Sequence, residues 1–444
     1  MPVEIKDKET KIRDAIRYSQ TVTCYGKIEK VVGMTIESTG PEVNVGDLCL
    51  VYPSRSAKAA DEGVKAEVIG IREKKVLLMP FEDISGIGPG SIVESTGSVL
   101  KIPVGEGLMG RIIDGMGNPI DGEGEIKTGE YYPVQNKVSN PLDRPRIDSR
   151  ITMGVKAIDG LLTCGEGQRL GIFAGSGVGK STLLGMIARN VEADINIIAL
   201  VGERGREVRE FMERDLKKKG MDRSVLVIAT SDQSAMMRLK CAMTATTIAE
   251  YFKDKGKKVL LMMDSLTRFA MAQREIGLAV GEPPIARGYT PSLYKEMPKL
   301  LERAGKFNVG SITGIYTVLV EGDDVNEPIS DTVRGIIDGH IVLSREVAMK
   351  NHYPAIDILG SISRLMNDIV DAKHIKLAGD MRDLLSTYDQ NYDLINTGAY
   401  KKGSSSKIEE AINKIDKINA FLKQEVMEVF DYNKTVKLMA DALR

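Results

Sequence analysis

Residues that commonly build metal or disulfide sites are scarce in this chain. Its 444 residues include no tryptophan, three histidines and four cysteines. The histidines are isolated, and there is no CxxC pair and no Cys/His cluster, so we expect neither a zinc site nor a disulfide framework. We interpret the four cysteines as buried free thiols in a reducing cytoplasm; they are Cys24, Cys49, Cys164 and Cys241.

Long apolar runs and an excess of one charge are also absent. No run approaches the length needed to span a bilayer, and residues 1–20 are too charged for a secretory signal. The 61 basic and 62 acidic residues nearly cancel, which gives no electrostatic footprint of a dedicated nucleic-acid binder. We therefore expect a cytoplasmic globular protein with room for two or three domains and no nucleic-acid partner.

Changes in pattern along the chain predict an α/β protein in four parts. Residues 1–20 form an N-terminal helical segment, which is either a solvated helix or a docking segment. Short β-rich runs broken by glycine and polar turns predict a small β-barrel over residues 21–92. Over residues 93–365, after a connecting segment, buried strand runs alternate with helices, which predicts a mostly parallel sheet. Strand patterns vanish over residues 366–444, a helical C-terminal domain.

A glycine-rich stretch, IFAGSGVGKST at residues 172–182, carries the strongest chemical signal. It fits the phosphate-loop pattern G-x-x-x-x-G-K-[ST], except that alanine takes the first glycine position. A strand-like run precedes it and a helix-like run follows, so an incidental glycine turn is the less favoured reading. We expect backbone N–H groups, a lysine and two hydroxyls to bind a nucleotide and Mg²⁺ here. The expected nucleotide-binding residues are Ala174, Gly175, Ser176, Gly177, Val178, Gly179, Lys180, Ser181 and Thr182.

Within this loop, Lys180 would reach the β- and γ-phosphates, Ser181 would bind Mg²⁺, and Thr182 could add a hydroxyl to the α-phosphate. Two carboxylates follow strand-like runs elsewhere. Asp264 ends KVLLMMD, which places it at the carboxyl edge of the sheet, where it can hold the water shell of Mg²⁺. Glu203 in ALVGERGRE either orients and deprotonates the attacking water or belongs to a surface ion-pair cluster.

Three longer motifs resemble the hexameric rotary ATPase superfamily, which includes the α and β subunits of ATP synthase. They are GERGRE, the long run from DSLTRFAMAQRE to LLERAG, and HYPAIDILGSISR. AGSGVGKS, TSDQSAMMRLKCA and INTGAYKKGSSSKIEEAI are closer to the ATPases of type III export, first the flagellum-specific ATPases and next those of the injectisome. The resemblance covers the chain from about residue 20 and implies a RecA-like P-loop ATPase domain between the barrel and the helices.

The resemblance also assigns roles to four residues. Glu203 matches the catalytic glutamate, which non-catalytic subunits lack, and Arg204 matches an arginine that contacts the terminal phosphate. Tyr353 matches the aromatic residue that packs on adenine. Arg364 matches an arginine presented to the nucleotide of the neighbouring subunit. Without the resemblance, an arginine at such a strand end would be expected to form a structural ion pair.

Together these features imply a Mg²⁺-dependent ATPase that energises flagellar type III protein export as a homohexamer. The resemblance implies a cytoplasmic location at the inner face of the membrane. Its implied partners are a regulator, a stalk protein, export chaperones and substrates, and the membrane export gate. Three alternatives remain: an injectisome secretion ATPase, an ATP synthase β-like subunit, and a nucleic-acid translocase. The near-neutral charge and a barrel without aromatic-basic interleaving disfavour the translocase.

Overall fold

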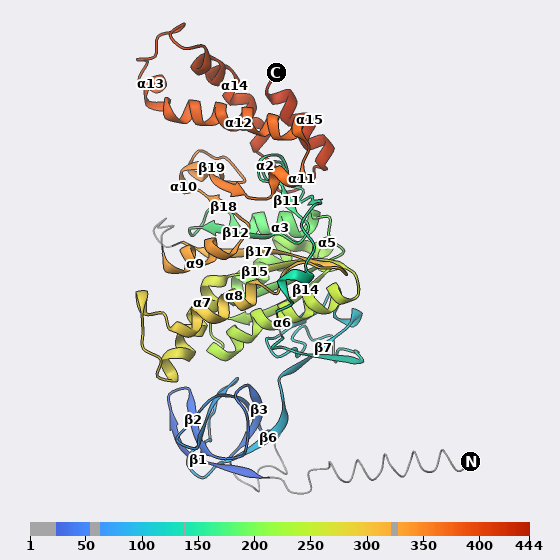
Figure 1. Cartoon of the computed structure of the whole chain (residues 1–444), viewed down its shortest axis with the longest axis vertical. Coiled ribbons are helices and arrows are strands. Elements are labelled where there is room, and N and C mark those ends of the chain that lie inside the picture. Colours follow the sequence, from blue (N-terminus) through green and yellow to red (C-terminus); the bar gives the residue numbers. More distant parts are fainter. Residues whose placement is uncertain (1–23, 54–62, 137, 321–326) are drawn as a thin grey trace, which may run out of the picture. The chain divides into compact units, whose positions relative to one another are not determined.

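The computed structural model describes residues 24–53, 63–136, 138–320 and 327–444 (Figure 1). The chain divides into two compact units, Met1–Leu100 and Lys101–Arg444. The predicted helical segment 1–20 lies outside the described residues. No helix in the described ranges is long and apolar enough to cross a membrane.

The first unit is a closed antiparallel barrel, as predicted. Its strands are ordered β1-β2-β5-β4-β3-β6, and β6 closes the barrel against β1. Alternating inward side chains from these strands form a small apolar core. The predicted boundary after residue 92 falls at the first residue of β6, and the whole of that strand belongs to the barrel. The strands are β1 (Tyr25–Val32), β2 (Thr35–Thr39), β3 (Asp47–Tyr52), β4 (Val64–Arg72), β5 (Lys75–Pro80) and β6 (Ile92–Val99).

The second unit is built on a nine-stranded sheet. Its order is β19-β18-β12-β17-β15-β13-β14-β8, with β16 paired to β17. All pairs along this order are parallel except β18 with β19. The strands are β8 (Ile112–Ile113), β12 (Arg169–Ala174), β13 (Ile195–Glu203), β14 (Ser224–Thr230), β15 (Lys258–Asp264), β16 (Gly305–Lys306), β17 (Ser311–Leu319), β18 (Gly339–Leu343) and β19 (Ile356–Ser363).

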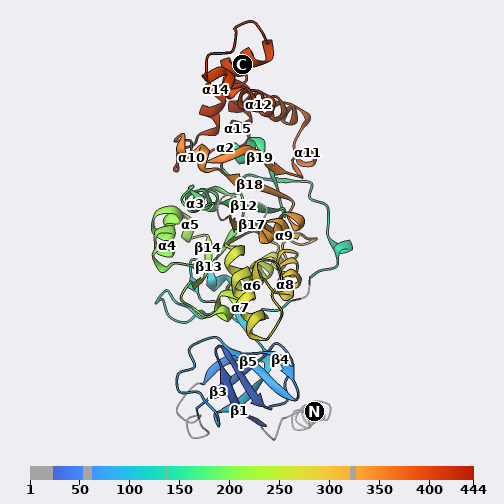
Figure 2. The ribbon, with the colours of Figure 1, turned by 90° about the vertical axis from the view of Figure 1, so that its left-hand side faces the viewer.

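Helices on both faces explain why the central strands read as continuous apolar runs (Figure 2). Ser234 and Ser265 cap α6 and α7 by accepting hydrogen bonds from backbone N–H groups three residues on. The helices are α2 (Lys156–Leu161), α3 (Lys180–Asn190), α4 (Gly205–Glu210), α5 (Lys217–Met221), α6 (Ala235–Asp254), α7 (Leu266–Ala279), α8 (Pro291–Leu301), α9 (Pro328–Ile336) and α10 (Arg345–Met349), with a π-helical turn at Phe211–Leu216.

Short elements connect this core. Two small sheets pair β7 with β9 and β10 with β11. One strand of the main sheet, β8, lies in the Gly-, Pro- and Asp-rich stretch that the sequence presents as a connection. The remaining elements are β7 (Lys101–Val104), β9 (Glu130–Pro133), β10 (Arg150–Ile151), β11 (Cys164–Gly165) and 3-10 turns at Glu106–Leu108, Pro141–Asp143 and Ala286–Gly288.

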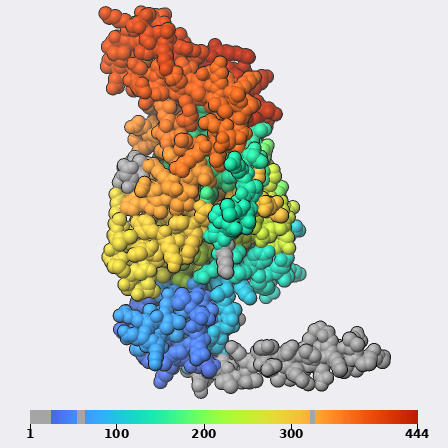
Figure 3. Space-filling view, in the orientation of Figure 1, coloured from blue at the N-terminus to red at the C-terminus, as the bar shows by residue number. Residues whose placement is uncertain are grey.

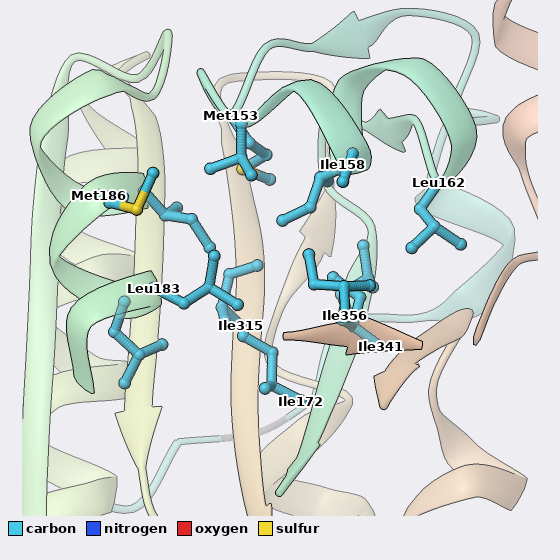
Figure 4. Close-up of a cluster of buried hydrophobic side chains, with 14 of the residues drawn as sticks. Met153, Ile158, Leu162, Ile172, Leu183, Met186, Ile315, Ile341 and Ile356 are labelled. Carbon is cyan, nitrogen blue, oxygen red and sulfur yellow. The ribbon is translucent and has the colours of Figure 1, made fainter. Parts of the chain in front are cut away.

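The C-terminal helices cover one end of the same unit (Figure 3). They share one apolar cluster with the sheet, because Met381, Phe421 and Met439 join the cluster of Ile158 and Ile172. Figure 4 shows its central part, where strand side chains meet those of α2 and α3. The helices, predicted from residue 366 onward, are α11 (Met366–Ile369), α12 (Ala372–Gln390), α13 (Tyr392–Asn396), α14 (Ser406–Leu422) and α15 (Tyr432–Ala442).

Three of the four cysteines are buried free thiols, as predicted, but Cys24 is exposed. The prediction of burial was wrong there because Cys24 directly precedes the barrel's first strand and lies outside its core.

Candidate nucleotide site

The glycine-rich stretch forms a loop between a strand and a helix. Strand β12 ends at Ala174, which is buried, and α3 begins at Lys180. Gly177 and Gly179 have φ of 79° and 90°, so this backbone path favours glycine at both positions. The side chain of Val178 is buried in the core, so this residue can offer a ligand only its backbone. The N-terminus of α3 adds its positive dipole to the loop.

The loop borders a cleft of about 640 Å³. The ends of β13, β15 and β17 reach the same cleft because parallel strands present their carboxyl ends at one sheet edge. Residues expected to bind the nucleotide line it together with carboxylates and arginines from neighbouring elements. Its lining includes Ala174, Gly175, Ser176, Gly177, Gly179, Lys180, Ser181, Thr182, Glu203, Arg204, Asp264, Arg268 and Arg345.

Lys180 meets both predicted carboxylates inside this cleft. Its ammonium forms an ion pair with Asp264 and lies 3.6 Å from Oε1 of Glu203. The hydroxyl of Thr317 donates a 2.7 Å hydrogen bond to Asp264 Oδ1, which fixes the carboxylate at the end of β15. Burial opposes the charge on Lys180, but Asp264 and Glu203 together raise its pKa. The cleft therefore holds a positive charge ready for phosphate oxygens.

Glu203 is a largely buried carboxylate whose Oε1 faces Lys180 beyond hydrogen-bond distance. Its side chain is 13% exposed, and no described residue hydrogen-bonds to its buried Oε1. Burial and the negative charge of Asp264 raise the pKa of Glu203 to about 7, against the opposing effect of Lys180. A carboxylate with such a pKa is suited to accept a proton near neutral pH. This burial disfavours a surface ion-pair cluster as the reading of Glu203.

The donors near the loop fit a hydrated Mg²⁺ ion. Ser181, at the first turn of α3, and Asp264, at the end of β15, both line the cleft and offer a hydroxyl and a carboxylate, which are the hard oxygen ligands that Mg²⁺ prefers. The unsatisfied Oε1 of Glu203 provides a hydrogen-bond acceptor for water at the same place.

Arginines also line the cleft. Arg204, singled out from the sequence, has a side chain that is 79% exposed, and its Nη1 lies 3.9 Å from Oε1 of Glu207. Arg268 was missed, although it stands four residues after Asp264 at the start of α7. Its Nε is buried and has no hydrogen-bond partner in the described ranges. Gly202, with φ of 70°, leaves room for it, since an added Cβ would lie 3.0 Å from Arg268 Cβ.

Tyr353 lies beside the phosphate loop rather than in the lining of the cleft. Its ring carbon Cδ1 is 3.6 Å from where a Cβ on Gly179 would be, and the residue is 45% exposed. The backbone N–H of Gln424 donates a 3.0 Å hydrogen bond to the Tyr353 carbonyl. An exposed aromatic face is therefore held next to the loop.

Arg364 lies at the opposite edge of the sheet from the loop. Strand β18 runs parallel to β12, with Leu343 beside Ala174, whereas β19 runs back and ends with Ser363 beside Gly339. The two ends of the sheet, one at the loop and one at Arg364, are separated by the length of β12. Its six residues span roughly 17–20 Å at about 3.3 Å per residue. Arg364 is exposed, and its Nη2 donates a 3.2 Å hydrogen bond to the carbonyl of Arg334.

Comparison with known families places each part of the chain. The nucleotide-binding domain of the ATP synthase alpha/beta family matches residues 154–363. The beta-barrel domain of the same family matches residues 28–97. The T3SS EscN ATPase C-terminal domain matches residues 370–441.

Relatives agree with these matches over nearly the whole chain. A flagellum-specific ATP synthase of Bacillus subtilis is 56% identical, with 94% of each chain covered. A type 3 secretion system ATPase of Xanthomonas euvesicatoria is 49% identical, covering 94% of this chain and 93% of the relative. The assembled ATPase EscN of enteropathogenic E. coli superposes with a TM-score of 0.89 at 46% identity, covering 94% of this chain and all of EscN. The chain therefore belongs to the ATP synthase alpha/beta family and is an ATPase of type III export.

Proposed function

We propose that this chain forms a homohexameric ring that hydrolyses Mg²⁺-ATP to energise flagellar type III export. The observation that carries the enzymatic part is the convergence of Lys180, Glu203 and Asp264 on the phosphate loop. A binding module would need the lysine and the loop, but not a buried carboxylate with a raised pKa beside them.

Hydrolysis would rest on positioning and charge stabilisation. The ammonium of Lys180 would exchange its ion pair with Asp264 for phosphate oxygens, and Glu203 would orient a water and accept its proton. Ser181 and Asp264 would hold Mg²⁺, which supplies positive charge to the phosphates when bound. Arg204 would turn from solvent to the terminal phosphate, and Tyr353 would pack on adenine.

The position of Arg364 supports a ring. A side chain at the opposite sheet edge cannot reach its own loop across roughly 17 Å of strand, but it can serve a neighbouring copy. A ring of identical chains would supply both halves of every site, because each copy presents a loop on one side and an arginine on the other.

Mixing two inactive variants tests this arrangement. Lys180→Ala removes the phosphate grip and keeps Arg364, whereas Arg364→Ala does the reverse. After subunit exchange, some boundaries pair an intact loop with an intact Arg364, so ATPase activity should partly return. Continued inactivity would contradict the trans role if a fluorescence exchange assay shows mixed rings that bind ATP.

The export role draws on the relatives. Some of them are flagellum-specific and others belong to type III secretion systems, so injectisome secretion is a second candidate. EscN has also been solved in complex with its central stalk EscO, which supports a stalk partner here. We further propose a cytoplasmic ring at the inner face of the membrane that engages a regulator, export chaperones, their substrates and the membrane export gate.

Deletion of the gene in its host separates the two export roles. For a flagellar ATPase, deletion should abolish filaments and motility, and the intact gene, but not its Glu203→Gln variant, should restore them. Intact filaments together with lost secretion of effector proteins would assign the chain to an injectisome instead.

A further inference from the structure

Strand β19, which leads to Arg364, is irregular. The pairing of β18 with β19 changes register at one place. His340 pairs with Ile362 and Val342 pairs with Asp357, so a step of two residues on β18 matches a step of five residues on β19. Residues 358–361 therefore form a bulge on the edge strand of the sheet. A bulge directs the chain that follows it, and Arg364 comes three residues after Ser361.

The guanidinium of Arg382, on α12, binds both ends of this bulge. Its Nη1 donates a 2.9 Å hydrogen bond to the carbonyl of Ile358, and its Nη2 donates a 3.3 Å bond to the carbonyl of Ser361. The same Nη2 donates a 3.0 Å bond to the carbonyl of Leu161, the last residue of α2. One planar side chain thus fixes the bulge against the C-terminal helices and α2, a geometry that lysine cannot reproduce.

Other contacts stiffen the bulge without linking it to the helical region. Asp357 Oδ1 accepts a 2.9 Å hydrogen bond from Gly360 N, and the Ser361 hydroxyl donates to the Asp357 carbonyl. The hydroxyl of Ser363 donates a 2.8 Å bond to the carbonyl of Thr163, two residues beyond Leu161. Arg382 therefore binds the bulge that precedes Arg364, and the end of α2, which Ser363 approaches through Thr163.

We propose that Arg382 is a positioning residue that holds Arg364 in line with the neighbouring subunit's nucleotide. This inference rests on the proposed trans role of Arg364. Arg382 belongs to the helical region, so a shift of α12 would move the β19 bulge and with it the arginine offered to the next subunit. Its loss should leave the chain's own phosphate loop, Lys180 and Glu203 intact.

The first test compares Arg382→Met with Asp383→Asn. Asp383 is the next residue of α12 and makes an exposed ion pair with Lys407, so it controls for a change of charge on this helix. We expect Arg382→Met to keep ATP affinity within about twofold while kcat falls roughly tenfold to a hundredfold, as misplacement of a catalytic group does. The kcat of Arg382→Lys should also fall, and the kcat of Asp383→Asn should match that of the parent. A parental kcat for Arg382→Met would overturn the proposal.

Subunit mixing distinguishes a misplaced Arg364 from a damaged cleft. Arg382→Met mixed with Lys180→Ala should recover activity, because the second variant supplies a well-placed Arg364. Arg382→Met mixed with Arg364→Ala should not recover, because both lack a working arginine at the boundary. The opposite pattern would overturn the proposal.

Two controls complete the design. The Arg364→Ala and Lys180→Ala pair is mixed in parallel. If this pair does not recover ATPase activity, both the trans role of Arg364 and the positioning role of Arg382 are contradicted. If this pair recovers activity but the Arg382→Met and Lys180→Ala pair does not, only the positioning role of Arg382 is contradicted. Gly360→Ala provides a variant that leaves α12 untouched: its Cβ would push the Asp357 carboxylate aside, so the bulge would lose the hydrogen bond from Gly360 N to Asp357 Oδ1. If Arg382→Met does not fold, Gly360→Ala should show the same mixing pattern, and a different pattern would count against a role for the bulge.

Discussion

Nζ of Lys180 lies 3.6 Å from Oε1 of Glu203, in a cleft where both side chains are only 13% exposed. The same ammonium is paired with Asp264, so one cation stands between two carboxylates that come from different strands. ATP phosphates entering this cleft would draw Lys180 away and leave the unsatisfied oxygen of Glu203 to water.

Glu203→Gln should abolish hydrolysis and leave ATP binding largely intact. The amide keeps the shape of the side chain but cannot take a proton, and the loss of a general base typically costs about 10²–10⁴-fold in rate. Turnover and nucleotide affinity measured on the same preparation check this expectation. Glu213→Gln is a matched control, because Glu213 is exposed and forms a surface ion pair with Arg209. Turnover near that of the parent would mean that Glu203 is not the base.

Tyr353→Ala should raise the KM for ATP roughly tenfold, since stacking of a base on an aromatic ring is worth about 1–3 kcal/mol. The effect on kcat should be smaller, because the ring lies beside the loop and away from Glu203 and Asp264. Tyr353→Phe keeps the stacking face and should resemble the parent. Tyr392→Ala, which removes a similarly exposed tyrosine on α13, is the control. An unchanged KM in Tyr353→Ala would remove the ring from the nucleotide site.

His352 should make the chain less stable in mild acid. Burial, then Lys423 and Lys350, lower the pKa of His352 to about 4, whereas the unfolded chain takes up this proton near pH 6.5. Between these values the unfolded state binds a proton that the folded state does not, so the free energy of unfolding falls as the pH falls from 6.5 to 4.

His352→Gln removes this titration. The free energy of unfolding of the variant, minus that of the parent, should be larger at pH 5 than at pH 7.5 by roughly 1–2 kcal/mol, since partial exposure of His352 screens part of the shift. Urea unfolding of both proteins at the two pH values provides the comparison, and the other titrating groups cancel in the difference. An equal difference at both pH values would show that the folded protein binds this proton normally.

Neither RNA nor single-stranded DNA should stimulate the ATPase appreciably at physiological salt. A translocase couples its strand to its cycle, whereas nonspecific binding to basic side chains weakens steeply as salt rises. Turnover measured with and without each polymer over a salt series distinguishes the two. Saturable stimulation that resists salt would favour the translocase alternative.

The local features of the nucleotide site could be predicted from short stretches of sequence. Two glycines with positive φ, a lysine at the start of a helix and aspartate at the end of an apolar strand are each encoded within a few residues. The alternation of buried strands with helices likewise predicted a mostly parallel sheet, and that sheet carries the site at its carboxyl edge.

Features that depend on strand order and register could not be predicted from the sequence and became visible in the folded chain. Burial of Glu203 beside Asp264 required β13 and β15 to be neighbours, and neither segment alone states this. Arg268, on α7, enters the cleft because Gly202, on strand β13, makes room for it. Arg364 lies at the sheet edge opposite the phosphate loop because β19 runs antiparallel to β18. The bulge in β19 is held by hydrogen bonds from Arg382 on α12. These contacts join residues far apart in the chain, so their geometry is set by packing of the whole unit and not by any local pattern.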